Sequence, residues 1–96
     1  MDTTIIKGKI SQIIEHEDKD KYILPHEFIK SKKNVIVVEI KEVKGLKDRI
    51  NRFFSRTDEH TRILLSDSID FKINEVVSLK VKPYWVKTKF YEIDEK

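Results

Sequence analysis

The residues best suited to a chemical role stand in the stretch from Val76 to Ile93, where basic and aromatic residues interrupt an apolar, strand-forming run. From Lys80 to Tyr91 the chain carries four lysines and no acidic residue. Because alternate residues of a strand share one face, Trp85 and Tyr91 would stand on the same face as two of these lysines. Cations that meet phosphates and flat rings that stack on bases are typical of surfaces that bind single-stranded nucleic acid.

The sequence therefore predicts a nucleic-acid interface, with single-stranded DNA or RNA as its ligand. The residues predicted to form it are Lys80, Lys82, Trp85, Lys87, Lys89 and Tyr91, with Arg49, Arg52 and Arg56 extending the basic track. The alternative is that an aromatic ring caps a small core, while the lysines keep an exposed sheet edge from pairing with another chain.

Pro83 divides this stretch into two phases. Before it, Leu79 and Val81 are the apolar members of an alternating pattern, which is the signature of a half-buried strand. After it, Val86 and Phe90 would be the buried residues, so that the buried face switches parity. Proline cannot donate to a sheet ladder, and a turn or bulge near residues 82–85 is therefore expected.

The nearest approach to a catalytic pair is Glu39 and Lys41, which strand alternation would place on one face. The triplet resembles the E-x-K half of the PD-(D/E)xK nuclease motif, which implies a metal-binding carboxylate and a lysine at a phosphodiester. That family also needs an upstream acidic residue, for which Asp18 and Asp20 are the candidates. A metal-dependent nuclease is thus one alternative, whereas the main prediction is a protein without catalytic residues.

Other cofactor signatures are absent from the sequence. The three histidines, His16, His26 and His60, share no metal-ligand spacing, and the chain has no cysteine for a thiolate zinc site. The acidic run around Asp18 and Asp20 lacks the glycine and the closing glutamate of a calcium loop. With two glycines the chain has no glycine-rich phosphate loop. We expect no metal and no cofactor.

Length and composition predict a single β-rich domain over residues 1–96, with an acidic tail at 94–96 that frays. Isoleucine and valine are abundant and alanine is missing, which favours strands. The dominance of lysine and glutamate among the 39% charged residues is the direction in which hyperthermophile proteins drift, so a thermophilic, archaeal or viral source is expected. No apolar run approaches 18 residues and no cysteine is present, which predicts a cytoplasmic protein outside the membrane.

The elements that must position the interface are mainly strands. We expect strands at Thr3–Glu15, Asn34–Val43 and Arg62–Asp67 and a strand pair within Val76–Ile93. A further strand is expected at Lys21–Ile29, or one that ends at Pro25, with a short helical turn at His26–Lys33. Gly8, inside the long first strand, predicts a bulge. This β-β-β-α-β-β order resembles that of the five-stranded OB barrel, which implies a binding face on the second and third strands. An SH3-like or other small barrel is the alternative.

The predicted helix spans residues 46–56, where Leu46, Ile50, Phe53 and Phe54 form one apolar stripe. Part of it, from Lys47 to Phe54, resembles the sliding-clamp-binding box Q-x-x-I-x-x-F-F, although lysine replaces the leading glutamine. The resemblance implies a replication, transcription or host protein as partner. A protein-binding accessory factor is therefore a second alternative function. The other interpretation of the helix is that its apolar stripe belongs to the core. The pattern leaves the oligomeric state open.

Overall fold

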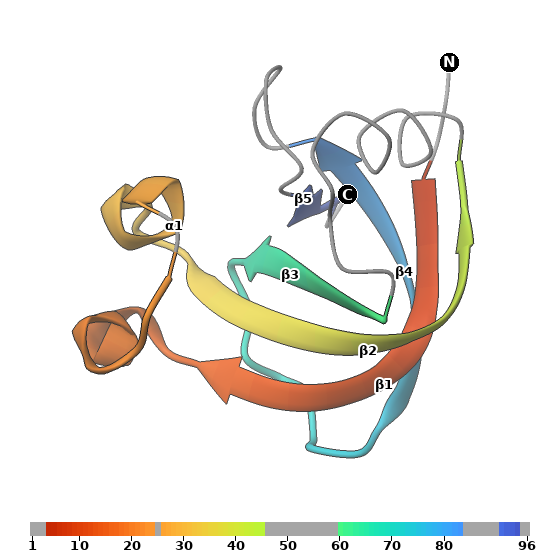
Figure 1. Ribbon diagram of the computed structural model, residues 1–96, viewed down its shortest axis with the longest axis horizontal. Coiled ribbons are helices and arrows are strands. Elements are labelled where there is room, and N and C mark those ends of the chain that lie inside the picture. Colours follow the sequence, from red (N-terminus) through yellow and green to blue (C-terminus); the bar gives the residue numbers. More distant parts are fainter. Residues whose placement is uncertain (1–3, 25, 46–59, 84–90, 95–96) are drawn as a thin grey trace.

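The chain folds into a closed five-stranded β-barrel in the order β1-β2-β3-β5-β4, consistent with a small OB-like barrel (Figure 1). The computed structural model describes residues 4–24, 26–45, 60–83 and 91–94. Neighbouring strands are antiparallel except β3 and β5, which are parallel. The strands are β1 (Thr4–Ile14), β2 (Asn34–Lys44), β3 (Thr61–Ser66), β4 (Val76–Pro83) and β5 (Tyr91–Ile93). The predicted mainly β barrel is thus confirmed.

Strand β1 is long enough to pair with β2 on one side and β4 on the other. Its register against β2 shifts between Lys7 and Gly8, as the glycine predicts. A Cβ atom at Gly8 would overlap the carbonyl oxygen of Glu39, so the close approach of the two strands requires glycine. At this shift the extra residue is Lys41 of β2, whereas at the second shift, between Ile10 and Gln12, the extra residue is Ser11 of β1.

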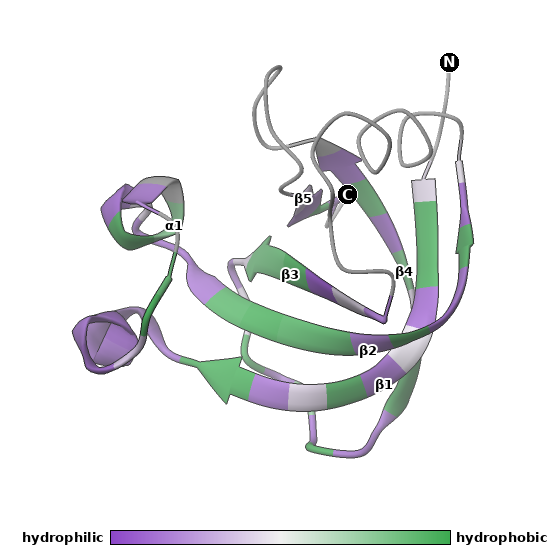
Figure 2. Ribbon diagram, viewed as in Figure 1, coloured by the Kyte–Doolittle hydropathy of each residue, from purple (hydrophilic) through white to green (hydrophobic). Residues whose placement is uncertain are grey.

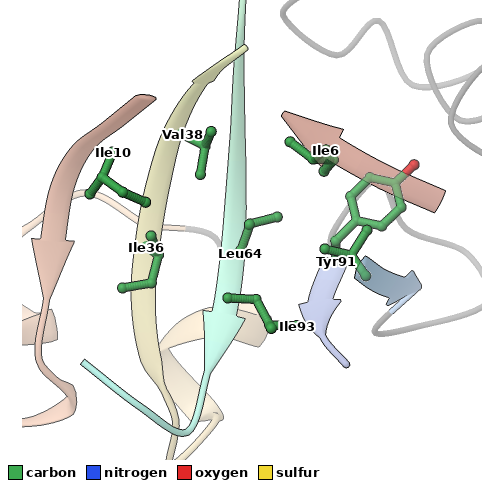
Figure 3. Packing of buried hydrophobic residues seen from close by; sticks show 8 residues of the cluster. Ile6, Ile10, Ile36, Val38, Leu64, Tyr91 and Ile93 are labelled. Atoms are coloured by element: carbon green, nitrogen blue, oxygen red, sulfur yellow. The ribbon is translucent and has the colours of Figure 1, made fainter. Parts of the chain in front are cut away.

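Two apolar clusters lie on opposite faces of the sheet. The barrel interior is filled by Ile6, Ile10, Ile36, Val38, Leu64, Val81, Tyr91 and Ile93 (Figure 3). The second cluster comprises Ile14, Phe28, Val35 and Leu65 and lies outside the barrel. Phe28 belongs to the short helix α1 (His26–Lys30), so this helix covers one end of the outer β1-β2-β3 surface.

The connection between β1 and β2 is helical, which corrects the prediction of a strand at Lys21–Ile29. The 3₁₀ helix η1 (His16–Lys21) precedes α1, and the predicted helical turn at His26–Lys33 is confirmed. The apolar residues of this segment, such as Leu24 and Phe28, pack onto the outer face of the sheet.

This correction also changes the order of the elements. The predicted helix at 46–56 lies outside the described residues, and its segment joins the second strand to the third. The connection from β3 to β4, residues 67–75, contains turns, with Asn74 at a positive φ of 72°. Among the residues described, no helix has the length and apolar character required to cross a membrane.

Candidate nucleic-acid interface

Tyr91 lies in the core, which corrects its predicted role as a base-stacking residue. Its side chain is 1% exposed and packs in the same cluster as Ile6 (Figure 3). Val81 pairs with Ile93 in the β4–β5 ladder, and both are buried, so Tyr91 faces inward two residues before Ile93. The predicted parity switch is therefore wrong at this end: the odd-numbered residues of β4 and β5 both face the interior.

Lys80 and Lys82 are exposed on the outer face of β4, as predicted. They alternate with Leu79 and Val81, which pack against or belong to the interior cluster. The alternation is visible in the banding of β4 by hydropathy (Figure 2). Two residues along a strand span about 6.8 Å, so the two ammonium groups can engage neighbouring phosphates of an extended strand.

The barrel register places two lysines of β1 beside those of β4. Lys7 pairs with Ser78, which shares the outer face of β4 with Lys80 and Lys82. Residues directly opposite each other in an antiparallel pair share one face, so Lys7 and Lys9 project from this same surface. Lys7 is exposed and Lys9 is half-buried.

Strand β2 adds one further lysine on the other side of β1. Lys44 pairs with Ile5, which in turn pairs with Lys80. Glu42 and Glu39 stand opposite Lys7 and Lys9. The outer surface thus grades from basic on β4 and β1 to mixed charge on β2. We use the name lysine face for the five lysines of this surface: Lys7, Lys9, Lys44, Lys80 and Lys82.

The ion pairs of the lysine face are exposed and long. Glu42 carboxylate oxygens lie 3.9 Å from Lys7 Nζ and 3.6 Å from Lys44 Nζ, and Asp94 lies 3.9 Å from Lys80 Nζ. The three lysine side chains are 48–65% exposed, so solvent screens these pairs and each contributes little. Within the described ranges, no carboxylate lies within ion-pair distance of Lys9 or Lys82. The ammonium groups are therefore accessible to an anionic ligand.

The other predicted binding residues lie outside the described residues. The flanking strands show to which connection of the barrel each of them belongs. Trp85, Lys87 and Lys89 belong to residues 84–90, which connect the end of β4 to β5. In OB barrels this connection is one of the two loops that flank the ligand. The arginines Arg49, Arg52 and Arg56 belong to the connection between β2 and β3.

Lys7, Lys9 and Lys44 are absent from the sequence-based prediction, although a signal was present. Lys7 and Lys9 repeat the K-x-K spacing of Lys80 and Lys82. What the sequence does not provide is the β1–β4 pairing, a contact between residues about seventy positions apart that puts the two K-x-K segments on one surface.

The structure separates the residues of the alternative, nuclease-like constellation. Glu39 pairs with Lys9, and from there β1 continues for roughly 17 Å, at about 3.3 Å per residue, to its end at Ile14. Asp18 and Asp20 follow in η1, beyond that end. In the part of the chain that the structure describes, no three histidine, aspartate or glutamate residues are grouped so as to hold a metal ion.

Comparison with protein-family models, curated proteins and solved structures gave no match to this chain. Fold and surface together define its class: a small OB-like β-barrel whose β1 and β4 strands present a basic outer face.

Proposed function

We propose that the protein binds single-stranded nucleic acid through the lysine face and the adjoining β4–β5 connection. The observation that carries the proposal is the register of β1 and β4, which places two K-x-K pairs one after the other along one exposed surface, with Lys7 opposite Ser78 and Lys80 opposite Ile5. In the sequence, β4 is followed by residues 84–90, which contain Trp85 and two more lysines. Lysines provide the phosphate contacts, and an aromatic ring adds stacking of about 1 to 3 kcal/mol per base.

A single strand fits this surface better than a duplex read in its major groove. The two described helices, η1 and α1, have six and five residues, too short to act as a recognition helix in the part of the chain described. The twisted surface of paired strands offers a row of cations along which an extended backbone can lie.

The test is a titration of the protein with an oligothymidylate of about 16 nucleotides, the upper end of the site sizes of OB folds. Trp85 is the only tryptophan, so its fluorescence reports on the β4–β5 connection. We expect saturable quenching that weakens steeply as salt is raised, because phosphate binding releases counterions. Tryptophan fluorescence and oligonucleotide anisotropy that both stay unchanged at about 50 mM salt would refute the proposal.

Variants separate the two kinds of contact. By anisotropy of a labelled oligonucleotide, Trp85→Ala should weaken binding at least about fivefold with little change in the salt slope. Lys87→Ala should reduce the slope by about 0.7, the value of one phosphate contact to a single strand.

A second candidate function, a protein-binding accessory factor, is favoured by apolar residues exposed in the β1–β2 connection. Tyr22, Ile23 and Ile29 are 41%, 104% and 43% exposed. Exposed apolar residues of this kind mark protein interaction sites when they form a patch. A partner that copurifies after nuclease treatment and is lost on Ile23→Ser would support this function. Loss of every partner on nuclease treatment would count against it.

A further inference from the structure

We infer that the bound strand follows the outer face of β4 and β1, with Lys7 and Lys9 as phosphate contacts, instead of the β2–β3 face that OB barrels commonly use. The inference rests on the proposed function and specifies where the ligand lies. It assigns a binding role to two lysines of β1 that sequence reasoning had left out.

The first reason is that one end of the β2–β3 outer face is already covered. Phe28 of α1 is fully buried against Val35 of β2 and Leu65 of β3. Leu24, from the chain just before α1, packs against the same cluster. A ligand on this end of the face would have to displace an apolar contact and expose its surface to water, which is unfavourable.

The second reason is the lack of cations on β3. Its outward residues are Thr61, Ile63 and Leu65, none of which can bind a phosphate as a cation does. Arg62, the one basic residue of the strand, is buried and pairs with Val38 of the interior cluster. Among the residues that the structure describes, the β3 side of the usual OB face therefore offers no exposed cation for the phosphates of a single strand.

The third reason is that Lys33, which directly precedes β2, is already paired with carboxylates of the protein. Lys33 Nζ contacts the Glu92 carboxylate of β5 and lies 3.3 Å from Asp67, just after β3. Its positive charge is therefore matched by carboxylates of the protein itself. By contrast, no described carboxylate is within ion-pair distance of Lys9.

The β1 lysines also continue the track of β4 in the right direction. The β1–β4 ladder runs from Lys9, opposite Val76, to Thr4, opposite Val81 near the end of β4. A strand lying on Lys9 and Lys7 would thus pass Lys80 and reach Lys82 near the end of β4. The path joins the lysines of β1 to those of β4.

The test compares two double variants with the same loss of charge. Lys7→Gln/Lys9→Gln removes the proposed contacts, and Lys30→Gln/Lys32→Gln removes two exposed lysines at the β1–β2 connection, beside the usual OB face. Binding of a labelled oligothymidylate of about 16 nucleotides is measured by anisotropy over a range of salt concentrations. Circular dichroism and thermal melting first establish that both variants remain folded.

We expect the β1 variant to bind about tenfold more weakly at low salt, with a salt slope reduced by about 1.4, twice the value of one contact. The control variant should stay within about twofold of the unmodified protein, because its lysines are off the path. Wild-type affinity in the β1 variant would overturn the path, as would equal losses in both variants, which indicate attraction by total charge alone. If the unmodified protein does not bind at all, the proposed function itself fails, and that result is distinct from either of these.

Discussion

At the scale of single residues, the ammonium of Lys19 holds the helical connection together. Lys19 is 2% exposed, and its Nζ donates to the carbonyl oxygens of Phe28 at 2.6 Å and Ser31 at 2.7 Å. Both carbonyls lie in the last turn of α1 or just after it, where helical backbone leaves acceptors without partners. Burial lowers the pKa of Lys19, and the two carbonyls compensate for the water that the ammonium has lost.

Replacing this residue, Lys19→Met, should lower the free energy of unfolding by about 2 kcal/mol, because two buried carbonyls lose their donor. Urea denaturation followed by circular dichroism measures the change. The control is Lys21→Met in the same helix, whose exposed pair with Asp18 contributes less than about 1 kcal/mol. Equal effects of the two substitutions would show that the buried donor has no special role.

Lys33 provides a prediction about pH. Its hydrogen bond to Glu92 is the main cause that raises its pKa above the ordinary 10.5, with Asp67 acting in the same direction and burial opposing it. A raised pKa means that the stabilisation is complete below pH 10.5 and is lost as the pH rises through the higher folded-state value.

Lys33→Met should therefore be less stable than the unmodified protein by about 1 kcal/mol at neutral pH. The difference between the two proteins should remain constant up to about pH 10 and shrink above the ordinary lysine pKa. Urea unfolding at a series of pH values measures it. A difference that grows above that pKa would have the wrong sign for this ion pair.

At the scale of elements, the close approach of β1 and β2 depends on Gly8. An added methyl group there would meet the Glu39 carbonyl and the Val38 side chain, both on β2. Gly8→Ala should cost about 1 to 3 kcal/mol of stability, the range found for overpacked sites. Ser11→Ala, near the second register shift of β1, loses one exposed hydrogen bond to the Val37 carbonyl and is a milder control. A neutral Gly8→Ala would mean that the two strands can separate at little cost.

Strands with a clear alternation could be predicted from the sequence, and elements made by packing could not. The strand at 34–44 and the register shift beside Gly8 follow from local patterns that determine backbone geometry. The prediction of a strand at residues 21–29 failed because Leu24 and Phe28 pack against the sheet through residues far from them in the sequence. A local pattern does not reveal such contacts. The prediction that Tyr91 faces outward failed because it extrapolated the alternation after Pro83 across residues 84–90. Alternate residues share a face only within one continuous strand.

At the scale of the whole molecule, the barrel closure creates the candidate site. The candidate lysines on β4 could be predicted from the sequence because K-x-K spacing within a strand is a local feature. Lys7 and Lys9 join them only because β1 returns to pair with β4. The same closure buries Arg62 and Tyr91, so it also determines which basic and aromatic residues have no contact with a surface ligand.

The most direct measurement of the central claim is an amide ¹H–¹⁵N spectrum recorded while unlabelled oligothymidylate is added. Binding at the lysine face should shift the amides of residues 5–9 and 78–82 in a saturable way that higher salt suppresses. The amides of 35–37 and 63–65, where the outward side chains pack in the cluster with Phe28, should change little. Shifts concentrated on those two segments of β2 and β3, or a spectrum unchanged by the oligonucleotide, would contradict the account.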